Sequence, residues 1–173
     1  MTLGDTAATM AATDPRAQAF GYAQRRSWVF VAWWYGATLA IPGAVDAGLS
    51  GLLGQDPERG IFMMIFGAVG SALGWLLTLG VRFSRKLPKP ASDIPRVEQS
   101  IRINPSVIRF SVIGAVLIAA GLVLFTPNGR SPQVLPIVGL IAAAQLSIAA
   151  GVAYSGWLLK NSAELYSRWL ERR

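Results

Sequence analysis

The chain has 173 residues, of which 53% are hydrophobic and only 14% are charged, and its formal net charge is +7. A soluble domain carries about 25% charged residues, so the composition argues against a soluble globular protein. The chain contains no Cys and no His. This excludes disulfides and thiolate chemistry, and it removes the usual axial ligand of b-type haem and the commonest general base. We therefore expect no bound cofactor, no metal site and no enzymatic activity.

The basic residues lie at the ends of long apolar runs, where membrane topology alone explains them, so the positive charge does not predict nucleic-acid binding. The pattern predicts an all-α, polytopic membrane protein with four transmembrane helices. The predicted spans lie at about residues 27–47, 61–81, 105–126 and 133–159, within a transmembrane domain of residues 25–173.

Residues 1–24 are small and polar, and they predict a flexible cytoplasmic tail. In the first span, Trp33 and Trp34 lie about 8 Å deeper than the start of the helix at 1.5 Å per residue. Two interpretations stay open for them: contact with a partner or a cofactor ring, or an aromatic belt that faces lipid.

Asp46 lies at the end of the first span and is the best candidate for a carboxylate that couples transport, because ionisable groups inside a membrane are usually functional. The alternative is an interfacial residue at the helix end, because a helix from Trp28 crosses the bilayer core in about 20 residues.

In the second span, small residues share one helical face, which predicts close packing against another helix. They are Gly67, Gly70, Ser71 and Gly74. Residues 82–104 form the only sizeable predicted loop, which is basic and cytoplasmic. Four of its side chains are candidates for contact with lipid headgroups: Arg82, Arg85, Lys86 and Lys89. Asn104 followed by Pro105 predicts the start of the third span, as an N-cap and a first helical residue.

The fourth span carries a small residue at every fourth position, a spacing that lets another helix backbone approach closely. The series is Gly139, Ala143, Ser147, Gly151 and Ser155. Gln145 lies near mid-span, about 160° around the helix from Ser147. An amide at that depth needs a hydrogen-bond partner, which could be another helix of the chain, a partner subunit or a transported solute. Residues 160–173 predict an amphipathic extension of the last helix at the membrane surface.

Only Arg59 and Arg130 of the sixteen Lys and Arg residues fall in the two short turns. The four spans form two predicted helical hairpins in the cytoplasmic (inner) membrane. The positive-inside rule predicts their orientation, with both termini and the basic loop in the cytoplasm. Anionic lipids at that face are expected partners.

The sequence contains no phosphate-binding, metalloprotease or hydrolase motif. The leading hypothesis is a non-catalytic accessory or scaffold subunit of a larger membrane protein complex, of respiratory, photosynthetic or secretion type, with other membrane subunits as partners. The alternative is a small oligomeric transporter or channel with Asp46 and Gln145 along its path.

Overall fold

The structure, a computed structural model, describes residues 14–84, 86–125 and 132–172. Its elements are α2 (Pro15–Leu52), α3 (Glu58–Leu77), α4 (Leu79–Arg82), α5 (Ile94–Phe125), the 3-10 turn η1 (Pro132–Val134), α6 (Leu135–Lys160) and α7 (Ser162–Glu171). All regular structure in these ranges is helical, which confirms the predicted class.

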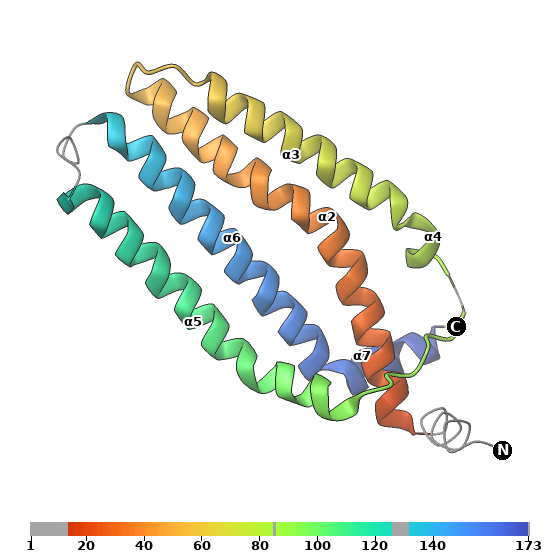
Figure 1. Ribbon diagram of the computed structural model, residues 1–173. Coiled ribbons are helices and arrows are strands. Elements are labelled where there is room, and N and C mark those ends of the chain that lie inside the picture. Colours follow the sequence, from red (N-terminus) through yellow and green to blue (C-terminus); the bar gives the residue numbers. More distant parts are fainter. Residues whose placement is uncertain (1–13, 85, 126–131, 173) are drawn as a thin grey trace.

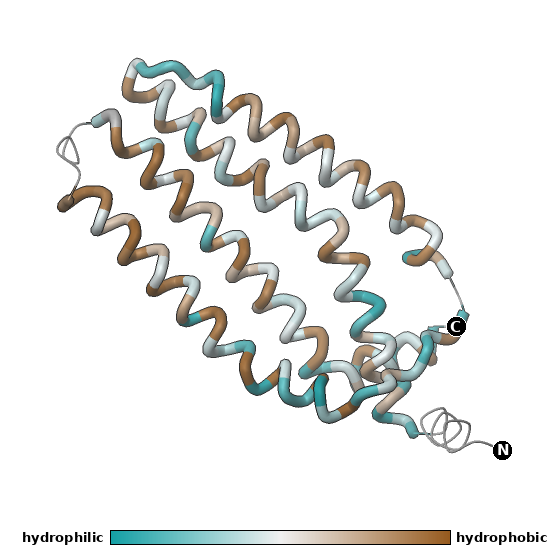
Figure 2. The backbone as a smooth tube through the Cα atoms, in the orientation of Figure 1, coloured by the Kyte–Doolittle hydropathy of each residue, from teal (hydrophilic) through white to brown (hydrophobic). Residues whose placement is uncertain are grey.

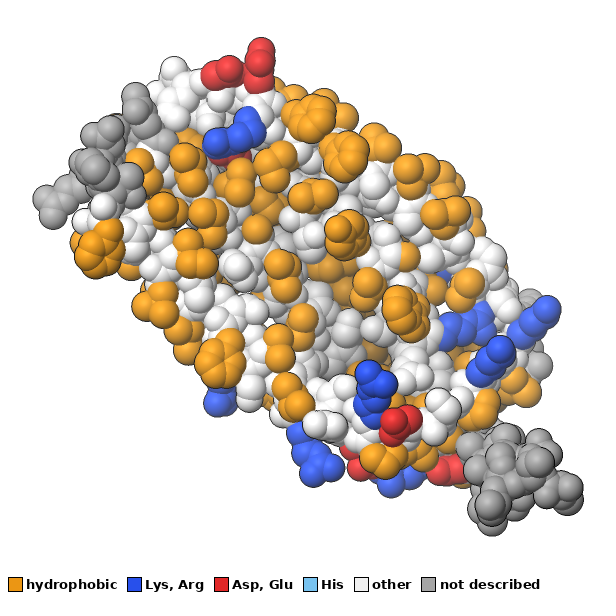
Figure 3. All heavy atoms as spheres, in the orientation of Figure 1, with side chains coloured by type: hydrophobic (Ala, Val, Ile, Leu, Met, Phe, Trp, Pro, Cys, Tyr) orange, Lys and Arg blue, Asp and Glu red, His pale blue; other side chains and the backbone are white. Residues whose placement is uncertain are grey.

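Four helices, α2, α3, α5 and α6, are long and apolar enough to cross a membrane. Figure 2 shows hydrophobic residues along the middle of each, with the hydrophilic residues gathered towards the helix ends and connections. On the face seen in Figure 3, most charged side chains likewise lie towards the two ends of the molecule. These four candidate spans suggest a multi-pass membrane protein, as predicted.

The four long helices lie side by side in one open row rather than in a closed bundle. The order across the row is α3, α2, α6, α5, and α7 packs against α2 (Figure 1). Very few residues of the outer helices are buried: three glycines in α3, and Val97 and Ala115 in α5. Each outer helix therefore uses a single narrow side for contact with the rest of the chain.

The first helix begins earlier than predicted, at Pro15, so that residues 15–24 are helical rather than part of a tail. Asp14 is the N-cap, and its Oδ1 accepts a 2.8 Å hydrogen bond from the backbone N of Arg16. These first turns contribute to both clusters of buried hydrophobic residues. Tyr22 packs on Tyr166 of α7, and Phe20 packs on Ala91. Residues 1–13 of the predicted tail lie outside the described residues.

The third long helix also begins earlier, at Ile94, so the predicted loop of residues 82–104 ends eleven residues sooner. Asp93 caps the helix, with its Oδ1 accepting a 2.9 Å hydrogen bond from the backbone N of Arg96. Asn104 is therefore not an N-cap, and Pro105 lies inside α5. A proline there removes one helical hydrogen bond, and the buried contacts of Val97 keep the preceding turns helical.

Candidate functional site

Glycines bring α2 and α3 into backbone contact. They recur every seven residues: Gly36 and Gly43 on α2, and Gly60, Gly67 and Gly74 on α3. A Cβ atom at Gly36 would lie 2.5 Å from the carbonyl oxygen of Gly67, so no side chain fits between the helices. The predicted packing residues Gly70 and Ser71 also border Gly36. The prediction missed the glycines of α2 and the first one of α3, although their spacing is visible in the sequence.

Beyond these glycines, the α2–α3 contact ends in an ion pair. Asp46 accepts hydrogen bonds from Arg59 at 3.0 Å to Nε and 2.5 Å to Nη2, and its side chain is 1% exposed. The candidate transport carboxylate is thus engaged by an arginine of the neighbouring helix. The geometry fits a bond that joins two helices.

The small residues of α6 lie in part against α2. Gly139 faces the side chains of Val45 and Leu49, and Gly151 faces the indole ring of Trp34. A Cβ atom at Gly151 would lie 2.5 Å from Nε1 of Trp34. The absence of a side chain at Gly151 is therefore what allows the indole to reach the α6 backbone.

A hydrogen bond fixes that indole, because Trp34 Nε1 donates to the carbonyl oxygen of Ser147 at 3.0 Å. The hydroxyl of Ser147 in turn donates to the carbonyl oxygen of Ala143 at 2.7 Å. Trp34, predicted as a partner contact, is thus used within the chain. Ser155 lines an open groove instead, because a strict four-residue spacing drifts about 40° per step around a helix.

The α5–α6 contact includes Asn104, whose Nδ2 donates to the carbonyl oxygen of Val152 at 3.1 Å. The Asn104 side chain occupies the space that Gly156 leaves open, and its buried Oδ1 has no hydrogen-bond partner in the described part of the chain. Gln145 precedes Val152 by seven residues, which places it about 20° away around α6. Gln145 therefore lies on the side of α6 that faces α5, and it is half-buried.

An apolar groove of about 580 Å³, here called the α6 groove, opens between α2, α5 and α6. Its α6 side is lined by Gly151, Ser155 and Gly156 together with the larger Ile148, Val152 and Leu159. Trp34 and Tyr35 of α2 form one wall, and Ile103 and Val107 of α5 form the other. Asp46 and Gln145 are absent from its lining, and they face different neighbours, α3 and α5.

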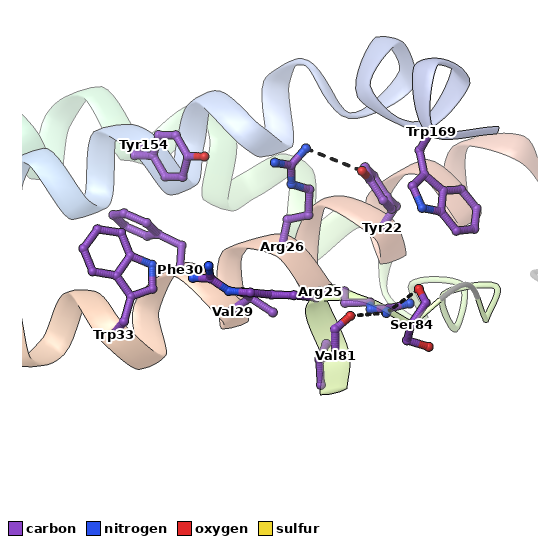
Figure 4. A pocket seen from close by; sticks show the side chains of 11 residues that line it. Tyr22, Arg25, Arg26, Val29, Phe30, Trp33, Val81, Ser84, Tyr154 and Trp169 are labelled. Carbon is purple, nitrogen blue, oxygen red and sulfur yellow. Dashed lines mark hydrogen bonds between the residues drawn. The ribbon is translucent and has the colours of Figure 1, made fainter. Parts of the chain in front are cut away.

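A second space of about 480 Å³, here called the arginine cavity, is lined by residues of α2, α4, α6 and α7, near the end of the molecule where α7 packs against α2 (Figures 1 and 4). Arg25, Arg26 and Arg82 line it together with an aromatic set: Tyr22, Phe30, Trp33, Tyr154 and Trp169. Trp33, the other predicted partner contact, is part of this aromatic wall.

Of the predicted headgroup residues that the structure describes, Arg82 alone lines the arginine cavity. Lys86 and Lys89 are exposed, and Arg85 lies outside the described residues. The sequence prediction did not combine Arg82 with Arg25 and Arg26, because these arginines lie on helices far apart in the chain.

Among the described residues, no three Asp or Glu side chains gather so that they could hold a metal ion. The two candidate sites are the α6 groove, which offers an apolar surface, and the arginine cavity, which offers positive charge beside aromatic rings. Comparison of the chain with models of protein families, with curated proteins and with solved structures finds no match.

Proposed function

We propose that the chain is a non-catalytic integral membrane subunit that scaffolds, assembles or seals a larger membrane protein complex. The observation that carries this proposal is the α6 groove. Trp34 covers Gly151 and Asn104 covers Gly156 within the chain, but Ser155 stays half-buried in the groove. A small residue in an open apolar groove allows a second transmembrane helix to approach closely.

The walls of the groove also suit a helix of a partner subunit. Tyr35 on the α2 wall of the groove is 74% exposed, and Val107 on the opposite α5 wall is 40% exposed. Large exposed side chains on both sides of the half-buried Ser155 give a partner helix a surface for close packing, and packing of this kind drives helix association in lipid.

The open row of helices supports the same proposal. Since α3 and α5 bury so few residues, both outer helices keep broad apolar surface for lipid or for further subunits. We propose that the row consists of two helical hairpins in an inner membrane, with the termini on the cytoplasmic side where the positive charge gathers.

The test is recovery of partner proteins when the tagged chain is purified from its native membrane in mild detergent. Ser155→Phe fills the groove and should lower the recovery of a stoichiometric partner at least several-fold. Ala153→Phe is the matched control, because Ala153 is exposed and lies about 160° around α6 from Ser155. A chain that purifies only as a homodimer, or a partner recovered equally with both variants, would overturn the proposal and favour a small transporter.

A further inference from the structure

The arginine cavity gathers positive charge. None of its described lining residues is acidic, and the ion pairs of the described residues use other arginines: Arg16, Arg59, Arg102 and Arg168. Three guanidinium groups therefore lie around one cavity with no acidic partner among the residues that the structure describes. Such a cluster favours an anion.

The three arginines differ in how many of their N–H donors are used in hydrogen bonds within the protein. Arg25 donates to the carbonyl oxygens of Val81, of Ser84 at 3.1 Å and of Lys86 at 3.0 Å, so it ties α2 to the end of α4. Arg26 makes a long hydrogen bond of 3.5 Å to the Tyr22 hydroxyl, as Figure 4 shows.

Arg82 rests over the ring of Trp75, at 5.4 Å from its centroid. A guanidinium has five N–H donors, so Arg26 and Arg82 keep most of theirs for a ligand. Arg25 instead holds the two helices that carry them in place.

The aromatic wall runs from these arginines into the membrane-spanning part of α2. Phe30 lies four residues beyond Arg26 and Trp33 lies seven, which is about 6 Å and 10 Å further along the helix. Phe30 contacts both Trp33 and Tyr154 of α6, with ring centroids 5.4 Å and 4.4 Å apart. One side of the cavity is thus cationic and the deeper side is apolar.

We propose that the arginine cavity binds a phosphate group, and that this phosphate belongs to an anionic phospholipid. Arg26 and Arg82 contact the phosphate oxygens, since a guanidinium matches phosphate geometry, and the wall of Phe30 and Trp33 takes an acyl chain. The volume of about 480 Å³ lies within the roughly 300–1,000 Å³ of small-molecule sites. The site does not depend on whether the chain joins a larger complex.

The experiment uses the full chain in vesicles of equal phosphatidylglycerol and phosphatidylcholine, followed by mass spectrometry of the lipid that stays bound to the released protein. We expect the wild type to retain phosphatidylglycerol. Arg26→Gln with Arg82→Gln should lower the ratio of bound phosphatidylglycerol to bound phosphatidylcholine about 25-fold, because each arginine contributes about fivefold. The control, Arg16→Gln with Arg102→Gln, removes the same charge from arginines outside the cavity and should keep the preference.

A second variant tests the space in the cavity separately from the charge of its arginines. Val29→Trp fills the cavity without altering an arginine and should also abolish the preference, whereas Val31→Trp, on another side of α2, should not. Three results would overturn the proposal: equal loss in both arginine double variants, retention of phosphatidylglycerol in Val29→Trp, or displacement of the lipid by millimolar inorganic phosphate. The last result would assign the site to a soluble phosphate.

Discussion

The carboxylate of Asp46 on α2 is held at two points by the guanidinium of Arg59, in the first turn of α3. The pair is asymmetric, because the Asp46 side chain is 1% exposed and the Arg59 side chain is 56% exposed. The carboxylate has lost its water and depends on Arg59, whereas Arg59 remains half in solvent. The two residues thus join the helices at the end where the chain turns from one into the other.

We expect Arg59→Gln to lower the free energy of unfolding by about 1–3 kcal/mol, because it leaves a buried carboxylate without its cation. Asp46→Asn should cost less, since the amide oxygen still accepts a hydrogen bond from Arg59. The measurement is unfolding by sodium dodecyl sulfate in detergent micelles.

Arg168→Gln is the control for this prediction. It breaks an exposed pair with Glu164, both side chains being 59% exposed, and should cost less than about 1 kcal/mol. If Asp46→Asn unfolds like the wild type and also stops the movement of a cation into vesicles, the assignment of a structural role to Asp46 is wrong.

The α2–α3 glycines allow a prediction with the same substitution at neighbouring positions. Gly67→Ala should destabilise the fold by about 1–3 kcal/mol, because a Cβ atom there would lie 2.6 Å from the carbonyl oxygen of Gly36. Gly70→Ala should be neutral or stabilising by up to about 1 kcal/mol, because its Cβ would lie 3.6 Å from the Cα of Gly36, an ordinary contact. The same unfolding assay compares them, and equal effects would mean that α2 and α3 do not meet at Gly67.

The sequence predicted the four long helices because each contains an uncharged run of about the length that spans a bilayer. It also predicted that Gly67 and Gly151 lie on packing faces, since small residues recur on one side of each helix. These predictions depend on local periodicity, which a single sequence displays directly.

The remaining features arise from contacts between distant residues. Nothing near Phe20 indicates that it packs on Ala91, so residues 15–24 resembled a tail although Asp14 and Pro15 carry a helix-start signal. Asp93 and Pro95 carry a helix-start signal similar to that of Asn104 and Pro105, where the sequence predicts the start of the third span. The sequence alone does not predict that Arg25 and Arg82 lie close together, because their proximity depends on the position of α4 beside α2.

The contact between Trp34 and Gly151 predicts energetic coupling between α2 and α6. Trp34→Phe removes the hydrogen bond to Ser147 and should cost about 0.5–1.5 kcal/mol. Gly151→Ala forces a methyl group against the indole and should cost about 1–3 kcal/mol. The double variant should cost less than the sum, by about 0.5–3 kcal/mol, because the smaller ring leaves room for the methyl group.

The matched cycle for this contact pairs Trp34→Phe with Gly121→Ala, since a Cβ atom at Gly121 would meet nothing within 4 Å. That pair should be additive within about 0.5 kcal/mol. Additivity in both cycles would show that Trp34 does not rest on Gly151.

The proposed orientation predicts which positions a membrane-impermeant maleimide can label from outside the cell. The chain contains no Cys, so single-cysteine variants report one position each. Asp56 lies in the short turn between α2 and α3, Ser92 lies in the basic connection before α5, and both are exposed. Only Arg59 and Arg130 of the Lys and Arg residues fall in the two short turns of the sequence. By the positive-inside rule, Asp56→Cys should therefore be labelled in intact cells and Ser92→Cys only after the membrane is opened. Labelling of Ser92→Cys in intact cells, with Asp56→Cys protected, would reverse the orientation and place the arginine cavity on the outer side of the membrane.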